Sequence, residues 1–274
     1  MKKINQIIYQ MTAPLAAVLI LVLFAGACNQ STDGVGTLKV VLHDNPGNFD
    51  EVVVEVLRVE VNNRLDAETG WIVINEPGAS YNLLDLVNGA HVVLGETELA
   101  AGEYRQIRLI LGDGNYVVID GDSYDLDTPS GQQTGIKLNI DAEIREGITY
   151  TLAIDFDAHR SVVKKGQTPV GAPFLLTPVI RAYAQAETGI ISGVVEPWDA
   201  INLTVSTVEN VGENPVSTTV EENTGEFRLL GLPEGTYSII VESDDFDAVT
   251  ITDLEVTAGE TTDAGTISLT EEEE

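Results

Sequence analysis

The sequence is poor in cysteine, in basic side chains and in aromatic side chains. The 274 residues include one cysteine, which excludes an internal disulfide. There are three histidines, far apart in the chain: His43, His91 and His159. Lysine and arginine together number 14 against 44 acidic residues, a formal charge of −30. Such acidity argues against nucleic acid as a partner, because its phosphates would be repelled. The patterns HExxH, CxxC, GxSxG and the P-loop are absent, so no motif identifies an enzyme and we expect none.

The N-terminus carries the most specific signal that is present. Two lysines precede an apolar run over residues 13–27, and Cys28 follows. The four residues Ala25-Gly26-Ala27-Cys28 resemble a bacterial lipobox, although leucine is usual at the first position. The pattern predicts a signal peptide over residues 1–27 and lipidation of Cys28. An uncleaved anchor is one alternative, although the run is short for a span of about 20 residues. An ordinary signal peptide is the other.

Cleavage before Cys28 would leave 247 residues (274 minus 27) and a charge of −32 (12 basic minus 44 acidic residues). Residues 28–36 then form a polar tether. Because an acidic protein is repelled by anionic lipid, we expect the lipid chain to hold it at the membrane. The predicted location is the cell envelope, at the outer membrane of a Gram-negative bacterium, since Asn29 argues against retention in the inner membrane. The acidity fits a salty habitat, binding of multivalent cations or plain solubility.

Apolar and polar residues alternate with a period of two over residues 148–156 and 135–140, which predicts half-buried strands. In the first strand Thr149, Thr151, Ala153 and Asp155 should face water. Charges change parity within residues 51–61, so we expect a bulge near Val56–Leu57. Closely spaced leucines predict one short helix over residues 81–87.

Turn sequences separate many short strands, which predicts an all-β fold of two consecutive antiparallel β-sandwiches. The alternation lapses over residues 182–188. We therefore expect one sandwich over residues 37–185, a second over 189–268 and an acidic tail over 269–274, each sandwich folding by itself.

Four motifs in the second segment carry a family resemblance. They are ISGVV (191–195), NTGEF (223–227), GLPEGTY (231–237) and VTAGE (256–260). In this order they resemble the carboxypeptidase regulatory-like module, a small prealbumin-type sandwich. The resemblance implies a non-catalytic accessory domain, often grouped with carbohydrate-binding-like folds, and that grouping supplies no ligand.

The first segment resembles a second family, exported prokaryotic domains known as domain of unknown function 4382. The resemblance rests on LHDNPGNFDEV (42–52), YNLLDLVNG (81–89), LAAGEYRQIRL (99–109), PSGQQTGIKL (129–138) and DFDAHRSV (155–162). It implies a fold and a location and carries no known reaction.

Two clusters of acidic residues are candidate cation sites. The first is dense in the oxygen ligands that calcium prefers: Asp113, Asn115, Asp120, Asp122, Asp125 and Asp127. Its spacing is not that of an EF-hand, and the alternative is that its Asp-Gly pairs simply form hairpin turns. In the second, Asp155, Asp157 and His159 would share one face if their strand continued. The alternative for these three is a solvated strand edge. Asp44 and Asp50 read as turn and cap residues.

Exposed aromatic rings would indicate a sugar site, but tryptophan occurs only at positions 71 and 198. Trp71 lies in an alternating run, which favours core or half-core packing over a sugar platform, and the same holds more weakly for Trp198. The sequence therefore predicts a lipid-anchored envelope protein that is a non-catalytic binding or structural module, with glycans or proteins as partners. The alternative is an envelope hydrolase whose site lies hidden among the acidic residues.

Overall fold

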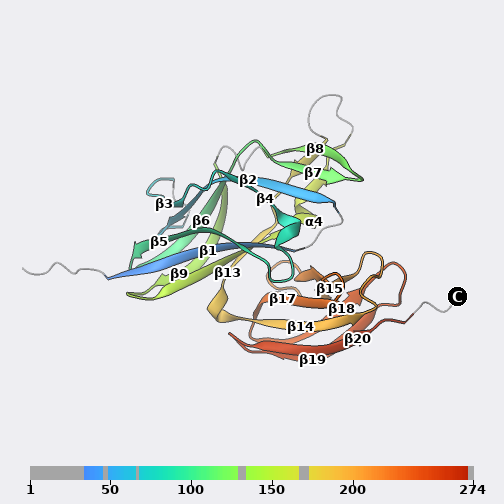
Figure 1. Cartoon of the computed structure of the whole chain (residues 1–274). Coiled ribbons are helices and arrows are strands. Elements are labelled where there is room, and N and C mark those ends of the chain that lie inside the picture. The colour runs from blue at the N-terminus through green and yellow to red at the C-terminus, as the bar shows by residue number, and fades with distance from the viewer. Residues whose placement is uncertain (1–33, 46–48, 66–67, 129–133, 167–172, 271–274) are drawn as a thin grey trace, which may run out of the picture. The chain divides into compact units, whose positions relative to one another are not determined.

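Two hydrophobic cores, each between two β-sheets, organise the computed structural model of this chain. The structure describes residues 34–45, 49–65, 68–128, 134–166 and 173–270. Cys28, the signal-peptide region and residues 271–274 of the predicted tail lie outside these ranges. The prediction of an all-β protein made of two sandwiches is confirmed (Figure 1).

The first sandwich consists of a four-stranded and a nine-stranded sheet. The smaller sheet has the order β13-β10-β1-β5, with bounds β1 Val35–Asn45, β5 Val92–Ala100, β10 Thr149–Asp157 and β13 Ile180–Ala184. The larger has the order β11-β12-β8-β7-β2-β6-β9, and β3 and β4 also pair with β2. Its bounds are β2 Glu51–Asn62, β3 Ile72–Asn75, β4 Ala79–Asn82, β6 Gly102–Leu111, β7 Tyr116–Ile119, β8 Asp122–Asp127, β9 Ile136–Ile144, β11 Val162–Lys164 and β12 Phe174–Leu176.

Local predictions for this sandwich hold where the pattern is strong. Strand β2 shifts register between Val56 and Arg58, so Leu57 is the extra residue of the bulge and is exposed. The predicted short helix is the 3-10 helix η1, Leu83–Leu86, whose cap is Asn82. Most pairs of strands in this sandwich are antiparallel, but β8 pairs with β12 in parallel, and so does β1 with β10. That pairing brings residues over 100 positions apart into one rung.

The second sandwich has a three-stranded sheet, β17-β14-β20, and a four-stranded sheet, β16-β15-β18-β19. The bounds are β14 Thr188–Glu196, β15 Thr204–Thr207, β16 Ser217–Thr219, β17 Glu226–Pro233, β18 Gly235–Glu242, β19 Val249–Val256 and β20 Thr261–Ser268. Phe227, Val205 and Ile239 are fully buried in its core. Figure 1 shows these strands in yellow to red.

Three element boundaries differ from the expected ones. Strand β1 begins at Val35, so the predicted tether is two residues shorter. Leu269 is buried in the second core and does not belong to a tail. Residues 182–184 still pair in β13, and only the 3-10 helix η2, Gln185–Glu187, separates them from β14. Among the described residues, no helix is long and apolar enough to cross a membrane.

Candidate functional site

A buried polar cluster lies on the face of β10 that was predicted to be solvated. His43 on β1 and Arg181 on β13 are the register partners of Asp155 on β10, so three neighbouring strands contribute one side chain each to one rung. Asp155 is 2% exposed and His43 is 5% exposed. The prediction that Asp155 faces water is therefore wrong, because further side chains cover this face of the sheet.

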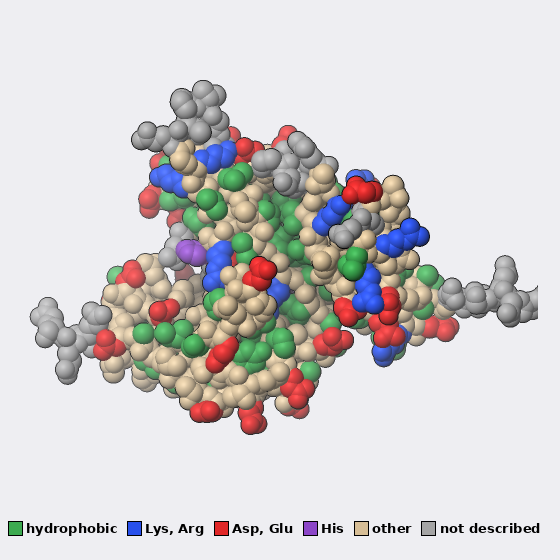
Figure 2. Space-filling model, turned by 180° about the vertical axis from the view of Figure 1, so that it is seen from behind, with side chains coloured by type: hydrophobic (Ala, Val, Ile, Leu, Met, Phe, Trp, Pro, Cys, Tyr) green, Lys and Arg blue, Asp and Glu red, His purple; other side chains and the backbone are tan. Residues whose placement is uncertain are grey.

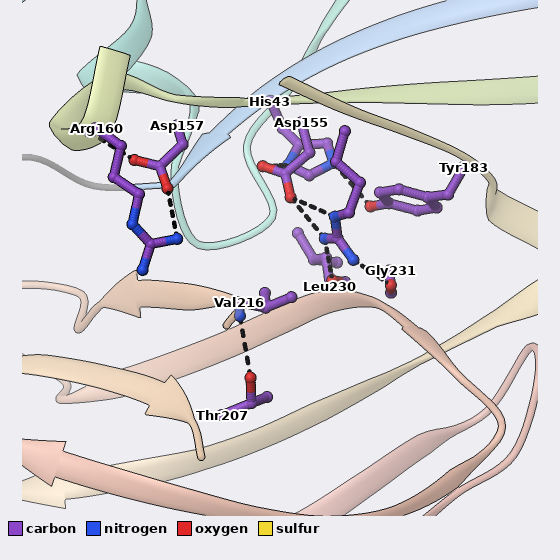
Figure 3. A network of polar contacts seen from close by, with 10 residues as sticks. His43, Asp155, Asp157, Arg160, Tyr183, Thr207, Val216, Leu230 and Gly231 are labelled. Carbon is purple, nitrogen blue, oxygen red and sulfur yellow. Dashed lines mark hydrogen bonds and ion pairs between the residues drawn. The ribbon is translucent and has the colours of Figure 1, made fainter. Parts of the chain in front are cut away.

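Arg181 contacts both Asp155 and Tyr183 and is the centre of the cluster, in which Figure 3 labels His43, Asp155 and Tyr183. Its guanidinium donates two hydrogen bonds to Asp155 Oδ2, of 2.6 Å and 3.1 Å. It also lies 4.9 Å from the centre of the Tyr183 ring. The Tyr183 hydroxyl lies 2.7 Å from His43 Nε2, and His43 Nδ1 lies 3.5 Å from Asp155 Oδ1. This geometry favours a histidine that accepts at Nε2 and carries its proton on Nδ1, facing the carboxylate.

Burial sets the protonation of the cluster. Loss of solvent lowers the pKa of His43, an effect that Asp155 partly opposes and Arg181 reinforces. Loss of solvent also raises the pKa of Tyr183. Because a lowered pKa keeps His43 neutral near pH 7, we treat its contact with Asp155 as polar and not as an ion pair. The charged pair is Arg181 with Asp155.

The same arginine reaches the second sandwich, which is possible because residues 34–274 form one compact unit. Strand β17 has two residues, Leu230 and Gly231, where β14 has one, and this bulge frees carbonyl groups from the ladder. Arg181 donates to the Gly231 carbonyl at 2.6 Å and to the Leu230 carbonyl at 3.1 Å. A second link is the hydrogen bond of 3.0 Å from Asn88 Nδ2 to the Glu226 carbonyl. We call the contacts of Arg181 and Tyr183 with β17 the Arg181 clamp.

A groove runs beside the clamp. One hollow of about 540 Å³ is lined by His159 and Arg160 of the first sandwich and by Ser206 and Ser217 of the second, among others. A further hollow of about 400 Å³ includes Phe49 and Thr219, and Asn202 and Thr204 line both. The two hollows therefore adjoin at these two residues. We call this the hydroxyl groove, lined by Phe49, His159 and Arg160 on one side and by Thr204, Ser206, Ser217 and Thr219 on the other.

The first predicted cation site is divided by the hairpin of β7 and β8. Asp120 and Asp122 are at its turn, where Asp120 has a φ of +53° and Gly121 of +80°. Asp113, Asn115, Asp125 and Asp127 lie at the opposite end, since the Leu126 amide donates to the Asn115 carbonyl. The four residues of β7 span about 13 Å, so one ion cannot contact both ends.

Individual ligands of that prediction already have structural partners. Asn115 is buried, accepts from the Glu55 amide at 2.8 Å and donates to the Gly112 carbonyl at 2.7 Å. Asp127 pairs with Lys165 at 2.8 Å. Within the described ranges, no three His, Cys, Asp or Glu side chains are grouped so that they could hold a metal ion.

The second predicted cation site depended on a continued strand, and the strand ends at Asp157. Asp157 caps the short helix α4, Ala158–Ser161, by accepting from the Arg160 amide at 2.9 Å. The expected alternation is therefore wrong beyond Asp157, and His159 is exposed on the helix. Burial raises the pKa of Asp157, which the bond to Arg160 opposes. The turn and cap roles fit as well, since Asp44 accepts from the Ala158 amide and Asp50 from the Gly121 amide.

Neither tryptophan is among the residues that line the two hollows. Trp71 is half-buried, and the guanidinium of Arg108 lies 4.2 Å from its ring centre. Arg108 in turn pairs with the buried Glu60. Trp198 is 38% exposed. An aromatic ring does line the hydroxyl groove, but it is that of Phe49, a residue that was not predicted to belong to a site.

Charge is unevenly divided between the sandwiches. Residues 188–270 contain 16 acidic residues and one basic residue, Arg228, a net charge of −15. The first sandwich, residues 34–187, contains 23 acidic and 11 basic residues, a net charge of −12. Figure 2 shows basic side chains gathered over one part of the visible face and acidic ones spread over all of it. An anionic ligand would meet repulsion over most of this surface.

Sequence reasoning missed Arg181 and Tyr183. A signal was present, because residues 180–184 alternate and place these two polar side chains on one face of β13. It could not be interpreted without the register that puts Arg181 opposite Asp155 and Tyr183 opposite Ala153, with both side chains against β17.

Family models match both parts of the chain. The model of a domain of unknown function (DUF4382) matches residues 35–171, which is half of the chain. The model of the carboxypeptidase regulatory-like domain matches residues 196–270. Both resemblances noted in the sequence are confirmed, in the expected order. No curated protein matches the chain.

Several solved structures show distant similarity. The TIE protein of Bacillus anthracis is 14% identical, with a TM-score of 0.22, over 87% of this chain and 34% of its own. A leucine-rich repeat protein from Bacteroides thetaiotaomicron is 14% identical, with a TM-score of 0.21, over 85% and 26%. The minor pilin GBS52 of Streptococcus agalactiae is 11% identical, with a TM-score of 0.23, over 86% and 97%. This chain thus spans about a third or less of the first two proteins, and such scores establish no shared activity.

Proposed function

The chain belongs to the DUF4382 family, a domain of unknown function, with a carboxypeptidase regulatory-like domain after it, and we propose that it acts as a lipid-anchored, non-catalytic binding module of the cell envelope. Cys28 carries the lipid, and the two sandwiches provide the binding surface. The location is the outer membrane of a Gram-negative bacterium, and the partners are glycans or proteins of the envelope.

One observation supports a non-catalytic role above others. In the single constellation that resembles catalytic machinery in the described residues, Tyr183 to His43 to Asp155, the histidine and the carboxylate are buried and all three side chains are already paired. Its tyrosine ring packs on Gly231, so closely that a Cβ there would lie 2.3 Å from the ring. Of the three side chains only Asp155 lines a hollow, and its carboxylate is already bound by Arg181, while the Tyr183 hydroxyl is bound to His43. These groups stabilise the contact between two sandwiches.

Lipid anchoring is tested by Cys28→Ser in the full chain, expressed in a Gram-negative host with a radiolabelled or alkyne fatty acid. We expect the variant to lose its acyl label and to leave the membrane fraction. Ser31→Ala, which keeps the cysteine, is the matched control and should retain both. A Cys28→Ser variant that stays labelled and membrane-bound would contradict the proposal.

The hydrolase alternative is tested on the wild-type chain with nitrophenyl esters and nitrophenyl glycosides. We expect no turnover above that of the uncatalysed reaction. Turnover that persists through purification and disappears in Asp155→Asn would establish an enzyme and overturn the non-catalytic role.

A further inference from the structure

We propose that the hydroxyl groove binds a neutral oligosaccharide. This inference rests on the proposed function, because it names the ligand class of a binding module. The groove combines side chains of both sandwiches, and the Arg181 clamp holds those two walls together. The two hollows measure about 540 Å³ and about 400 Å³, within the range of about 300–1,000 Å³ that is usual for small-ligand sites.

Two paired strands of the second sandwich build one wall of the groove. Ser206 on β15 is opposite Ser217 on β16, and Thr204 is opposite Thr219. All four are half-buried, while Val205 between them points into the second core. Four hydroxyls thus lie on one face of two adjacent strands. Within the described parts of the chain, none of these four hydroxyls makes a hydrogen bond, although the Thr219 carbonyl accepts one from the Thr218 hydroxyl at 3.3 Å.

The other wall supplies a donor without an acceptor. Arg160 Nη1 is shielded from solvent and makes no hydrogen bond to the described residues. It lies 3.4 Å from Asp157 Oδ2, a weak contact for an arginine. A shielded donor of this kind costs free energy until it meets an oxygen. Because Arg160 lines the larger hollow, a rotation of its side chain would bring this donor to a ligand hydroxyl or ring oxygen there.

The charges of the lining select among oxygen-rich ligands. Asp157, Glu242 and Asp244 line the larger hollow beside Arg160, so the carboxylates outnumber the guanidinium. An anionic sugar would be repelled, whereas carboxylates accept hydrogen bonds from neutral hydroxyls. Serine and threonine both donate and accept, as a polyol requires.

An apolar surface completes the match to a sugar ring. Phe49 lines the smaller hollow, and its ring centre lies 6.4 Å from that of His159 with 37° between the planes. A pyranose presents C–H groups on one face and hydroxyls at its edge. The C–H face can pack on the ring of Phe49, and the hydroxyls at the edge can bond to the serine and threonine hydroxyls of the opposite wall.

The test is calorimetry on the full-length chain in detergent, with neutral hexasaccharides of glucose, mannose and N-acetylglucosamine and with a galacturonate hexamer as the anionic counterpart. We expect at least one neutral hexasaccharide to bind with a Kd at or below about 1 mM, and more tightly than the galacturonate. The double variant Ser206→Ala with Ser217→Ala should weaken that binding about tenfold to thirtyfold, because two hydrogen bonds are lost.

A matched control is Ser192→Ala, which removes a half-buried serine from β14 in the other sheet and should leave the affinity unchanged. Melting curves of all variants establish that each is folded. Phe49→Ala provides a second, independent loss of affinity. Three results would overturn the proposal that the groove binds a neutral oligosaccharide. They are binding that survives both groove variants, binding of galacturonate alone, and no binding of any hexasaccharide at about 1 mM. The proposal would also be overturned if the groove bound a protein partner and the same variants abolished that binding. In each of these cases, acyl labelling of Cys28 and the absence of turnover would still support the proposed function.

Discussion

Arg181 on the last strand of the first sandwich donates a hydrogen bond of 2.6 Å to the carbonyl of Gly231 in the second. The acceptor belongs to a bulge in β17, and the donor is also paired with the buried Asp155. One side chain therefore connects the polar cluster of one sandwich to the edge strand of the other. The two sandwiches meet at this contact, so it is where substitutions should reveal whether they behave as one body.

Replacement of Gly231 by alanine should be unusually destabilising. Its φ is +68°, and an added Cβ would lie 2.3 Å from the Tyr183 ring. We expect a loss of about 3 kcal/mol in the free energy of unfolding, from backbone strain and overpacking together. Gly259→Ala is the control, because its φ of +76° is similar but nothing lies within 4 Å of the new Cβ. Denaturant unfolding measures both. Equal losses in the two variants would mean that the ring of Tyr183 gives way without cost.

Removal of the Arg181 charge should leave Asp155 buried without a partner. We expect Arg181→Leu to lower the free energy of unfolding by about 3 kcal/mol, and Arg181→Lys to have a smaller effect, because lysine keeps the charge but cannot reach both acceptors. Arg145→Leu is the control, since Arg145 pairs with Glu143 in solvent and its loss should leave the unfolding midpoint unchanged. A melting curve of Arg181→Leu like that of the wild type would show that the clamp adds no stability.

Limited proteolysis tests whether the two sandwiches fold independently. Their cores are separate, and only η2 lies between β13 and β14. We predict the first cleavage within residues 185–188, yielding two protease-resistant fragments, and faster cleavage in Arg181→Leu than in the wild type. Mass spectrometry of the fragments locates the cut. Fragments that lose their structure once separated would show that the sandwiches depend on each other.

His43 should make stability fall on mild acidification. Burial lowers its pKa below the ordinary 6.5, so as the pH falls below about 6.5 the unfolded chain takes up a proton that the folded chain refuses. The free energy of unfolding should therefore drop as the pH falls through 6.5 toward the folded pKa, with a slope of at most about 1.4 kcal/mol per pH unit. The comparison of wild type with His43→Gln between about pH 7 and pH 5 isolates this proton.

Asp157 acts in the opposite direction, since its raised pKa favours the folded state as the carboxyl protonates at more acidic pH. An identical pH profile for wild type and His43→Gln would mean that the imidazole titrates normally in the folded protein.

Calcium should stabilise the fold no more than sodium does at matched ionic strength. The charge of −30 destabilises the compact state through repulsion, which salt screens over about 10 Å at 0.1 M, so any salt should raise the melting temperature. Asp120→Asn with Asp122→Asn should not alter the response to calcium. An extra stabilisation by calcium that this double variant removes would restore the hairpin as a cation site.

Strand periodicity and local backbone chemistry were readable in the chain because they depend on near neighbours. The alternation of residues 135–140, the parity change at Val56–Leu57 and the leucines of η1 each predicted the element that forms. The two family segments and their order were readable for the same reason, since their turns and corners are local motifs.

The polar cluster and the groove could not be read in this way, because they depend on which strands become neighbours. Asp155 looked solvated until the parallel pairing of β1 with β10 and the antiparallel pairing of β10 with β13 surrounded it. Thr204, Ser206, Ser217 and Thr219 looked like ordinary strand residues until a register of two short strands gathered their hydroxyls on one face. A period of two tells which side chains share a face of one strand, but contacts over 100 residues apart in sequence decide what that face meets.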